Sequence, residues 1–217
     1  MLIDFDGVIL RNHISSKFII NRCDNYVQIK LNTHARHSKF VNENLYGTTG
    51  HTLHGLHKLG HNQYSVKDFN DYVYGDIQYP SMFKDIRTTH AQDIQQFINL
   101  NEWCKKNETK LFIFSNAPDE WCNNICKLMS PKLDDIETTN LMLKNHFLKP
   151  NQDAYTVLDY HLKRYKKIIN IDDKLINLMP TIDNDRWTHY LFANNYKEKF
   201  PISHNLKVIQ ELNEIMS

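Results

Sequence analysis

The stretch Asp4-Phe5-Asp6-Gly7 follows three apolar residues, Met1-Leu2-Ile3, at the start of the chain and decides the fold. An apolar run that breaks into acids predicts a buried strand of a parallel sheet that ends in a loop. Phe5 separates the two acids, so their carboxylates leave the chain in different directions, and Gly7 lets the loop turn sharply. Acids at the carboxyl end of a parallel strand lie where open α/β sheets bind ligands. Taken alone, the stretch is equally typical of a solvated strand end.

Three later stretches also place polar groups directly after apolar ones. Residues 110–114 lead to Ser115-Asn116, Lys149-Pro150 opens an amphipathic helix, and residues 168–171 lead to Asp172-Asp173. A carboxylate, a hydroxyl, an amine and an acid pair suit phosphoryl transfer to an aspartate, in which a carboxylate attacks phosphorus. The hydroxyl and the amine hold phosphoryl oxygens. The acid pair binds a hard divalent cation, usually Mg²⁺ where phosphate is a co-ligand.

These four motifs, in this order from Asp4 to Asp173, resemble those of the haloacid-dehalogenase (HAD) superfamily of phosphohydrolases. The resemblance implies an α/β fold: a HAD-like Rossmannoid three-layer core around a parallel sheet, with an inserted α-helical cap. The alternation of strand-like and helical stretches favours the same parallel sheet with helices on both faces. Residues 187–192 are predicted to be the last strand, and residues 204–216 a closing helix.

The segment of residues 14–85 has helical spacing and lacks strand-like runs. Ser65 followed by Asp68 predicts a helix start within it. A right-handed crossover between strands needs only one helix, so a segment of this length does more than cover the sheet. We therefore predict two domains, a helical cap of residues 14–85 over the active site and a catalytic core made of residues 1–13 and 86–217.

The cap carries a narrower resemblance. Its stretches Tyr46-Gly47-Thr48-Thr49 and Leu53-His54-Gly55-Leu56 are similar to the cap of the pyrimidine 5′-nucleotidase-type branch of HAD enzymes. This chain departs from that branch at Gly7, at Ser115 and at Lys174, where the branch commonly has Asn, Thr and Ser. Lys174 adds a cation beside the predicted metal site.

The resemblance implies that residues of the cap recognise the substrate. Tyr46 is predicted to stack on a base, while Thr49 and His54 bond to its polar edge. The alternative is that Tyr46 packs in the core and that the glycines around it only shape turns.

The resemblance and the strand-end positions together assign roles in the core. Asp4 is the predicted nucleophile, and Asp6 protonates the leaving alcohol and then activates water. The predicted phosphate-binding residues are Ser115, Asn116 and Lys149. The predicted ligands of Mg²⁺ are the Asp4 side chain, the Asp6 backbone carbonyl and Asp173, with Asp172 in support.

The implied function is a Mg²⁺-dependent phosphatase that acts through an aspartyl-phosphate, with nucleoside 5′-monophosphates as substrates and pyrimidine nucleotides preferred. Two alternatives stay open. One is the same chemistry on another small phosphate ester, such as a sugar phosphate. The other is a catalytically silent binding protein on the same fold. Its mark would be the loss of Asp4, Asp6, Lys149 or the acid pair, and all of these residues are present.

Composition gives no support to other classes of partner. The net charge of +1 on 217 residues offers no electrostatic argument for nucleic acid or a membrane surface. No apolar stretch approaches the length of a membrane span, and no signal peptide is visible. The four cysteines match no zinc pattern and predict reduced thiols. The expectation is a cytoplasmic enzyme that acts on a small-molecule phosphate ester, a nucleotide first.

Overall fold

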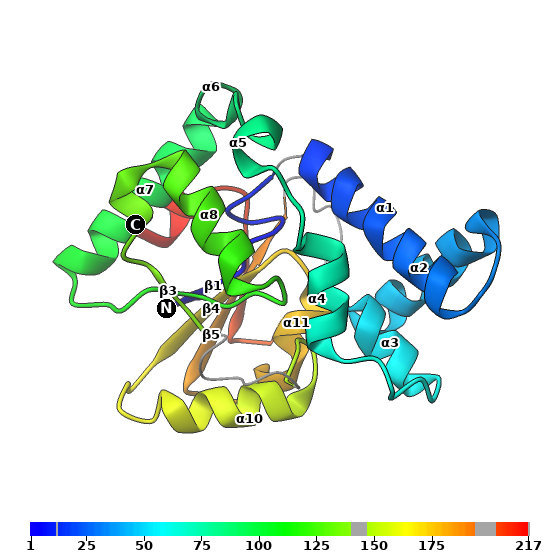
Figure 1. The fold of residues 1–217 in the computed structure, drawn as a ribbon. Helices are drawn as coiled ribbons and strands as arrows, with labels where there is room; N and C mark the ends of the chain where they lie inside the picture. The colour runs from blue at the N-terminus through cyan, green and yellow to red at the C-terminus, as the bar shows by residue number, and fades with distance from the viewer. Residues whose placement is uncertain (12, 140–146, 194–202, 217) are drawn as a thin grey trace.

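The computed structural model of the chain describes residues 1–11, 13–139, 147–193 and 203–216. It has a central sheet with helices on both faces and a group of helices, α1 to α4, to one side (Figure 1). The strands are β1 (Leu2–Ile3), β2 (Phe112–Ile113), β3 (Glu137–Thr138), β4 (Ile168–Asp172), β5 (Trp187–Phe192) and β6 (Leu206–Ile209). They lie in the order β3-β2-β1-β4-β5-β6, and all neighbours are parallel. The predicted α/β fold with a parallel sheet is confirmed.

Strand β1 lies in the middle of the sheet. Leu2 is in register with Phe112 of β2 on one side and with Asn170 of β4 on the other. The chain builds one half of the sheet from β2 and β3, and it then returns to build the other half from β4 onward. The order therefore reverses between β1 and β4, which is where open α/β sheets bind ligands. Asp4 directly follows β1, and Asp172 ends β4.

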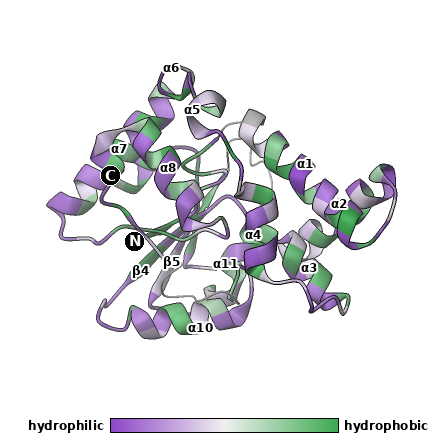
Figure 2. Ribbon diagram, in the orientation of Figure 1, coloured by the Kyte–Doolittle hydropathy of each residue, from purple (hydrophilic) through white to green (hydrophobic). Residues whose placement is uncertain are grey.

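Alternate residues of the strands face opposite sides of the sheet, as the pleat requires. Ile3, Ile113 and Ile171 belong to the larger hydrophobic cluster, which includes residues of α7 (Ala91–Lys106) and α8 (Asp119–Met129). Residues of the other face pack with α10 (Gln152–His161) and include Leu2, Phe112 and Ile168. Helices α8 and α10 each carry both hydrophobic and hydrophilic residues, as expected for helices with one buried face (Figure 2).

The helices of the predicted cap have a hydrophobic cluster of their own. They are α1 (His13–Lys30), α2 (Ala35–Thr49), α3 (Thr52–Lys58) and α4 (Val66–Tyr74). Their shared buried residues are Cys23, Tyr26, Val27, Leu45, Leu53, Leu56, Phe69 and Val73. The predicted helix start is confirmed, since Ser65 Oγ accepts a hydrogen bond from the Asp68 amide at 3.0 Å.

The division into cap and core stays a prediction, and the packing of α1 to α4 supports most of it. Two helices follow before the core resumes, α5 (Tyr79–Met82) and α6 (Ile86–Thr89). Ile77 and Phe83 lie inside the predicted cap segment, yet they pack into the larger cluster of the sheet. The end of this segment is therefore part of the core's packing.

The C-terminal part of the fold differs from the sequence prediction. The predicted closing helix over residues 204–216 is wrong, because β6 and a short 3-10 helix, η4 (Leu212–Met216), occupy this stretch. Its buried residues recur every third position, a spacing that also suits a helix, and they are Leu206, Ile209, Leu212 and Ile215. Pairing with β5 completes the sheet and overrides that local pattern.

The remaining short elements are η1 (Pro131–Leu133), α11 (Leu175–Leu178) and η3 (Met179–Thr181). Strand β3 was not predicted; it lies in a stretch of weak periodicity, of which residues 140–143 fall outside the described residues. Across the described ranges, no helix combines the length and the apolar character needed to cross a bilayer. All four cysteines are buried and free.

Candidate active site

Three carboxylates meet at the point where the order of the sheet reverses. Asp4, Asp172 and Asp173 each offer one oxygen, and these oxygens lie within 4.8 Å of one another. Burial raises the pKa of the Asp4 carboxyl well above its usual range, Lys149 opposes this shift, and the neighbouring carboxylates add to it. Such a group of acids is stable in ionised form only beside compensating positive charge.

Lys149 provides one positive charge at this place. Its Nζ lies 2.9 Å from Asp4 Oδ1 and 2.6 Å from Asp172 Oδ2, and the residue is 1% exposed. The ammonium also lies 4.9 Å from the centre of the Phe114 ring. Burial alone would lower the pKa of Lys149, but Asp172 and Asp4 outweigh it, so that the pKa is raised. Lys149 is therefore a buried cation held between two strand ends.

The backbone of Lys149 is fixed by Asn116. The side-chain amide of Asn116 donates to the Lys149 carbonyl at 2.9 Å and accepts from the Lys149 amide at 2.8 Å. These two bonds position Lys149, and the predicted contact of Asn116 with phosphate stays a prediction. Ser115 is buried at the end of β2, where its Oγ accepts from the Ala117 amide at 3.1 Å. That oxygen still carries a proton to donate.

The helix after Lys149 begins later than predicted. Pro150 was expected at the first helical position, but Asn151 is the N-cap of α10 and accepts from the Asp153 amide at 3.0 Å. An asparagine side chain satisfies the free amides of a first turn, which proline cannot do. Pro150 therefore lies before the cap, in the loop that presents Lys149.

The two acids of the pair have different surroundings. Asp172 is fully buried, and both its oxygens accept hydrogen bonds, from Lys149, from the Lys174 amide and from Asn177 Nδ2 at 3.0 and 3.1 Å. Asp173 is half-buried, and its Oδ2 forms an ion pair with Lys174 Nζ at 3.1 Å. Burial raises the pKa of Asp173, and Lys174 opposes that shift. Asp172 is thus occupied by protein donors, while Asp173 keeps ligand capacity.

Gly7 makes the approach of these two loops possible. Its φ of +100° is unfavourable for other residues, and a Cβ there would lie 2.5 Å from Asp173 Oδ2. Only glycine lets the loop after β1 lie this close to the acid pair. The backbone conformation and the close contact with Asp173 explain why this chain has glycine here, where the nucleotidase branch commonly has asparagine.

Asp6 lies at the rim of the acid cluster and keeps accessible surface. Its Oδ1 accepts a hydrogen bond from the indole Nε1 of Trp121 at 3.2 Å. Protein atoms packed around the carboxyl raise its pKa to about 6; the indole bond lowers it, the charge of Asp173 raises it, and Lys149 lowers it. Asp4 is thus paired with a cation, whereas Asp6 beside it bonds to a neutral donor.

Sequence reasoning missed Asn177 and Trp121. Asn177 lies in α11, and an amide one helical turn beyond the acid pair was a weak signal for it. Trp121 lies in the first turn of α8, and nothing in the local sequence indicates that it reaches Asp6, 115 positions away.

The three predicted substrate-binding residues of the cap differ in placement. Tyr46 is 48% exposed, yet burial raises the pKa of its hydroxyl, and the charges of Asp173 and Asp4 raise it further. Thr49 is buried, and its hydroxyl bonds to the carbonyls of Leu45 and His51 at 2.7 and 2.8 Å. The charges of the acid cluster therefore act on the Tyr46 hydroxyl, whereas the Thr49 hydroxyl is hydrogen-bonded to backbone carbonyls of the cap.

His54 shows no link to the acids. Its Nδ1 is buried without a partner among the described residues, and its pKa is lowered by burial and then by Lys58 and His57. These influences all come from the protein around it in α3, in contrast to those on Tyr46. A substrate contact of His54 stays a prediction.

The cap meets the core close to these residues. Gly50 ends α2 with a φ of +71°, and its amide donates to the Tyr46 carbonyl at 2.8 Å. A Cβ on Gly50 would lie 3.0 Å from Pro150 Cδ and 3.5 Å from Asn177 Oδ1. The end of α2 therefore rests on the loop that presents Lys149 and on the amide that holds Asp172. This contact brings Tyr46 toward the acid cluster.

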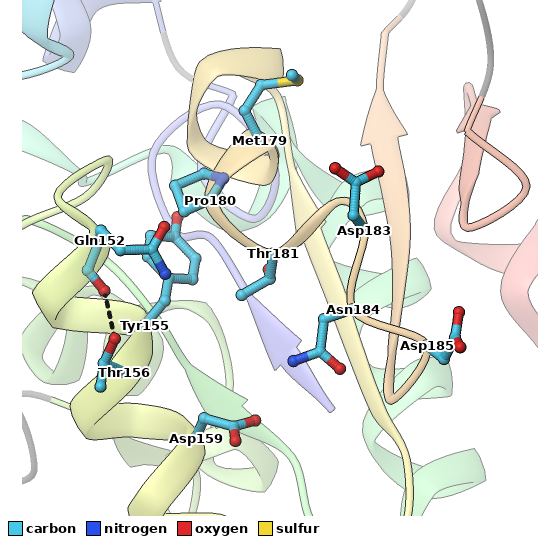
Figure 3. Close-up of a pocket in the computed structure, with 10 residues that line it drawn as sticks. All are labelled: Gln152, Tyr155, Thr156, Asp159, Met179, Pro180, Thr181, Asp183, Asn184 and Asp185. Carbon is cyan, nitrogen blue, oxygen red and sulfur yellow. Dashed lines mark hydrogen bonds between the residues drawn. The ribbon is translucent and has the colours of Figure 1, made fainter.

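A separate cavity of about 700 Å³ lies between α10 and the segment from η3 to β5 (Figure 3). Gln152, Tyr155, Thr156 and Asp159 line it from α10, and Met179 to Thr181 with Asp183 to Asp185 line it from the facing segment. None of the predicted site residues belongs to this lining. The residues predicted from sequence to carry the chemistry therefore lie outside this cavity.

No protein-family model and no curated protein sequence matches the chain. Among solved structures, the fold is similar to the crystal structure of a HAD phosphatase from Thermococcus onnurineus, with a TM-score of 0.55 and 14% sequence identity. The match covers 99% of this chain and 94% of that one. A likeness at this identity shows the fold alone, and it confirms the predicted HAD-like arrangement.

Proposed function

We propose that the protein is a Mg²⁺-dependent phosphatase that forms an aspartyl-phosphate on Asp4. The observation that carries the proposal is the convergence of Asp4, the buried Lys149 and the acid pair at one edge of the sheet. The similar fold of a HAD phosphatase supports it. A silent binding protein has no need for a buried lysine held between two carboxylates, an arrangement that costs desolvation energy.

Each step of the reaction has a residue suited to it. A carboxylate oxygen of Asp4 attacks phosphorus, the ester P–O bond breaks, and the leaving oxygen takes the proton of Asp6. Asp6 then removes a proton from water, the water oxygen bonds to phosphorus, and the bond from phosphorus to Asp4 breaks. Inorganic phosphate leaves, and both acids return to their starting state. The Ser115 hydroxyl and the Lys149 ammonium stabilise the phosphoryl oxygens as charge shifts.

The donor set fits a hard cation. Carboxylate oxygens are the ligands that Mg²⁺ prefers, and the cluster offers three of them within a small volume. Asp4 and Asp173 would hold the ion by their side chains and Asp6 by its backbone carbonyl, while Asp172 is already occupied by protein donors. When bound, Mg²⁺ would offset negative charge on the phosphoryl oxygens. Lys174 pairs with Asp173 at 3.1 Å and would have to release it.

A panel of phosphate esters tests this function. The panel should include a pyrimidine nucleoside 5′-monophosphate, a purine one, a sugar phosphate and p-nitrophenyl phosphate, each with Mg²⁺ and with EDTA. We expect phosphate release that stops in EDTA, returns with Mg²⁺ and is inhibited by excess Ca²⁺. Ca²⁺ takes more ligands at longer distances, so both oxygens of Asp4 would coordinate it and neither would attack. Full activity of metal-stripped enzyme in EDTA would contradict the proposal.

Nucleoside 5′-monophosphates, with pyrimidine nucleotides first, are the proposed substrates. The residues at the acid cluster contact only the phosphoryl group, so discrimination must come from what covers the leaving group. Tyr46 is the predicted cap residue whose pKa is raised by the acids as well as by burial, and the residue is 48% exposed, so we propose that its ring stacks on a base. Any other small phosphate ester would make less use of an aromatic ring at this place.

Tyr46→Ala should weaken the reaction of nucleotides selectively. We expect kcat/KM to fall more for the preferred nucleotide than for p-nitrophenyl phosphate. The difference should correspond to about 1–3 kcal/mol of transition-state stabilisation, the usual scale for one base stack. The measurement is a pair of kinetic titrations on the two substrates with wild-type and variant protein.

Phe40→Ala is the matched control, because Phe40 is an exposed aromatic residue of the same helix. This variant should leave kcat/KM unchanged for both substrates. Equal losses on both substrates in Tyr46→Ala would indicate a role in folding or cap closure instead. No loss on either would remove Tyr46 from the site.

A further inference from the structure

The indole of Trp121 is buried and tightly packed. It is 0% exposed, and three aromatic rings surround it, with centroids 5.4 Å away for Tyr74, 5.9 Å for Tyr79 and 5.7 Å for Phe83. The interplanar angles of 53 to 68° are tilted or edge contacts, which aromatic pairs favour. Packed in this way, the ring has little freedom to turn, so the direction of its N–H is fixed.

That N–H points at the carboxylate next to the nucleophile. Nε1 donates to Asp6 Oδ1 at 3.2 Å, and an indole can only donate. The indole does not ionise at working pH, so it stays a hydrogen-bond donor. One oxygen of Asp6 is thereby held, while Oδ2 is left to exchange a proton with the substrate side.

We propose that Trp121 is a positioning residue for the Asp6 general acid and base. The inference rests on the proposed function, which gives Asp6 that role. A general acid works only when its proton lies within hydrogen-bond reach of the leaving oxygen, and misplacement by about 1 Å can cost about 100-fold in rate. Asp6 lies on a loop at the rim, where its side chain has accessible surface and needs an anchor. The indole supplies this anchor without taking part in the proton transfer.

The same contact connects Asp6 to the segment that returns the chain from the cap. Tyr74 ends α4, Tyr79 begins α5, and Phe83 directly follows α5. Phe83 packs in the core cluster together with Trp121, and Tyr79 packs against that cluster. The orientation of the indole, and through it that of Asp6, therefore depends on how this segment is seated.

The test uses leaving groups that differ in their need for a proton. An alkyl phosphate has a poor leaving group, which must be protonated as it departs. The p-nitrophenolate leaves without that help, and its pre-steady-state burst reports only the first chemical step. Trp121→Phe keeps an aromatic ring in the packed position and removes the N–H.

We expect Trp121→Phe to lower kcat for the alkyl phosphate by about tenfold or more beyond any change in the p-nitrophenol burst rate, with KM little altered. Phe83→Leu disturbs the same aromatic packing but keeps the indole N–H, so its selective loss on the alkyl phosphate should be smaller than that of Trp121→Phe. Trp121→His restores a ring N–H and should recover part of the lost rate on the alkyl ester. Thermal unfolding curves of all variants identify any that do not fold.

Equal losses on the two esters in Trp121→Phe, or no loss on either, would overturn the positioning role. A folded Trp121→His variant that recovers none of the alkyl-ester rate would also count against it. If the wild-type protein hydrolyses neither ester with Mg²⁺, the proposed function fails, and this inference fails with it. An active wild type with equal losses in the variant refutes the inference alone.

Discussion

Asp4→Asn is expected to abolish turnover and leave the fold intact. An amide cannot form the phosphoenzyme, so phosphate release should fall by roughly four orders of magnitude or more, as on removal of other covalent nucleophiles. The variant should melt at least as high as the wild type, because burial disfavours the ionised Asp4 carboxyl that the amide replaces. Lys149 keeps its ion pair with Asp172 at 2.6 Å in the variant. Phosphate release and a thermal melt of the purified variant measure both effects.

Asp135→Asn provides a matched control, since it makes the same chemical change at an exposed ion pair with Lys105. It should leave turnover unchanged. Activity of Asp4→Asn within tenfold of the wild type would rule out Asp4 as the nucleophile. A large loss of melting temperature would show instead that Asp4 is needed for the fold.

Lys149→Met should remove activity and, unlike Asp4→Asn, also weaken the fold. Methionine has a similar volume, so packing is kept while the charge between Asp4 and Asp172 is lost. Removing one partner of a buried ion pair commonly costs about 3–5 kcal/mol, because the remaining charge is left uncompensated. Denaturant unfolding measures this cost, and phosphate release measures the activity.

The pH dependence of the cost has a defined sign. Without Lys149 nothing opposes the rise of the Asp4 pKa, so in the folded variant this carboxyl binds a proton at higher pH than in the unfolded chain. Stability is then greater at low pH and falls as pH rises through the folded-state pKa. The deficit relative to wild type should therefore be smaller at mildly acidic pH than at alkaline pH.

Lys110→Met is the control for loss of a lysine ion pair. Lys110 pairs with Glu137 at 2.5 Å, but both side chains are exposed, and such pairs contribute about 0–1 kcal/mol. A deficit in Lys149→Met no larger than that of Lys110→Met would refute the view that Lys149 is the cation that holds the acid cluster together.

The strand-end rule made the core of the site predictable. Asp4, Ser115 and Asp172 each come directly after an apolar run, and parallel strands bring their carboxyl ends to one edge. Lys149 was predicted from its place in the motif order. The parallel sheet is confirmed by the structure, whereas the catalytic roles of these residues stay predictions.

The residues that hold this site in place were not predictable in the same way. The bond of Trp121 to Asp6 depends on how α8 packs against the loop after β1, and no local pattern records that. The pair of bonds between Asn116 and Lys149 likewise joins the loop after β2 to the loop before α10. Such contacts follow from tertiary packing, which residue type and spacing do not record.

The prediction of a closing helix over residues 204–216 was wrong for a different reason. Its apolar residues recur every third position, from Leu206 to Ile215, and that spacing is compatible with a helix and equally with a strand followed by a 3-10 turn. The choice depended on β5, whose edge pairs with β6 over four residues. The pairing of β6 with β5 could not be predicted from the sequence of this segment alone.

The central position of β1 has a consequence for how the protein is made. Strand β1 finds its neighbours only when Phe112 and Asn170 have been synthesised. At about 5–20 residues per second, β4 follows β1 by roughly 10 to 30 seconds. Until β2 is made, Leu2 and Ile3 have no strand of this sheet beside them, and until β4 is made one side of β1 stays unpaired. The nascent chain therefore depends on its own helices or on chaperones to shield these apolar residues. The loop after β1 is thus translated before both flanking strands and reaches its final form only after both of them.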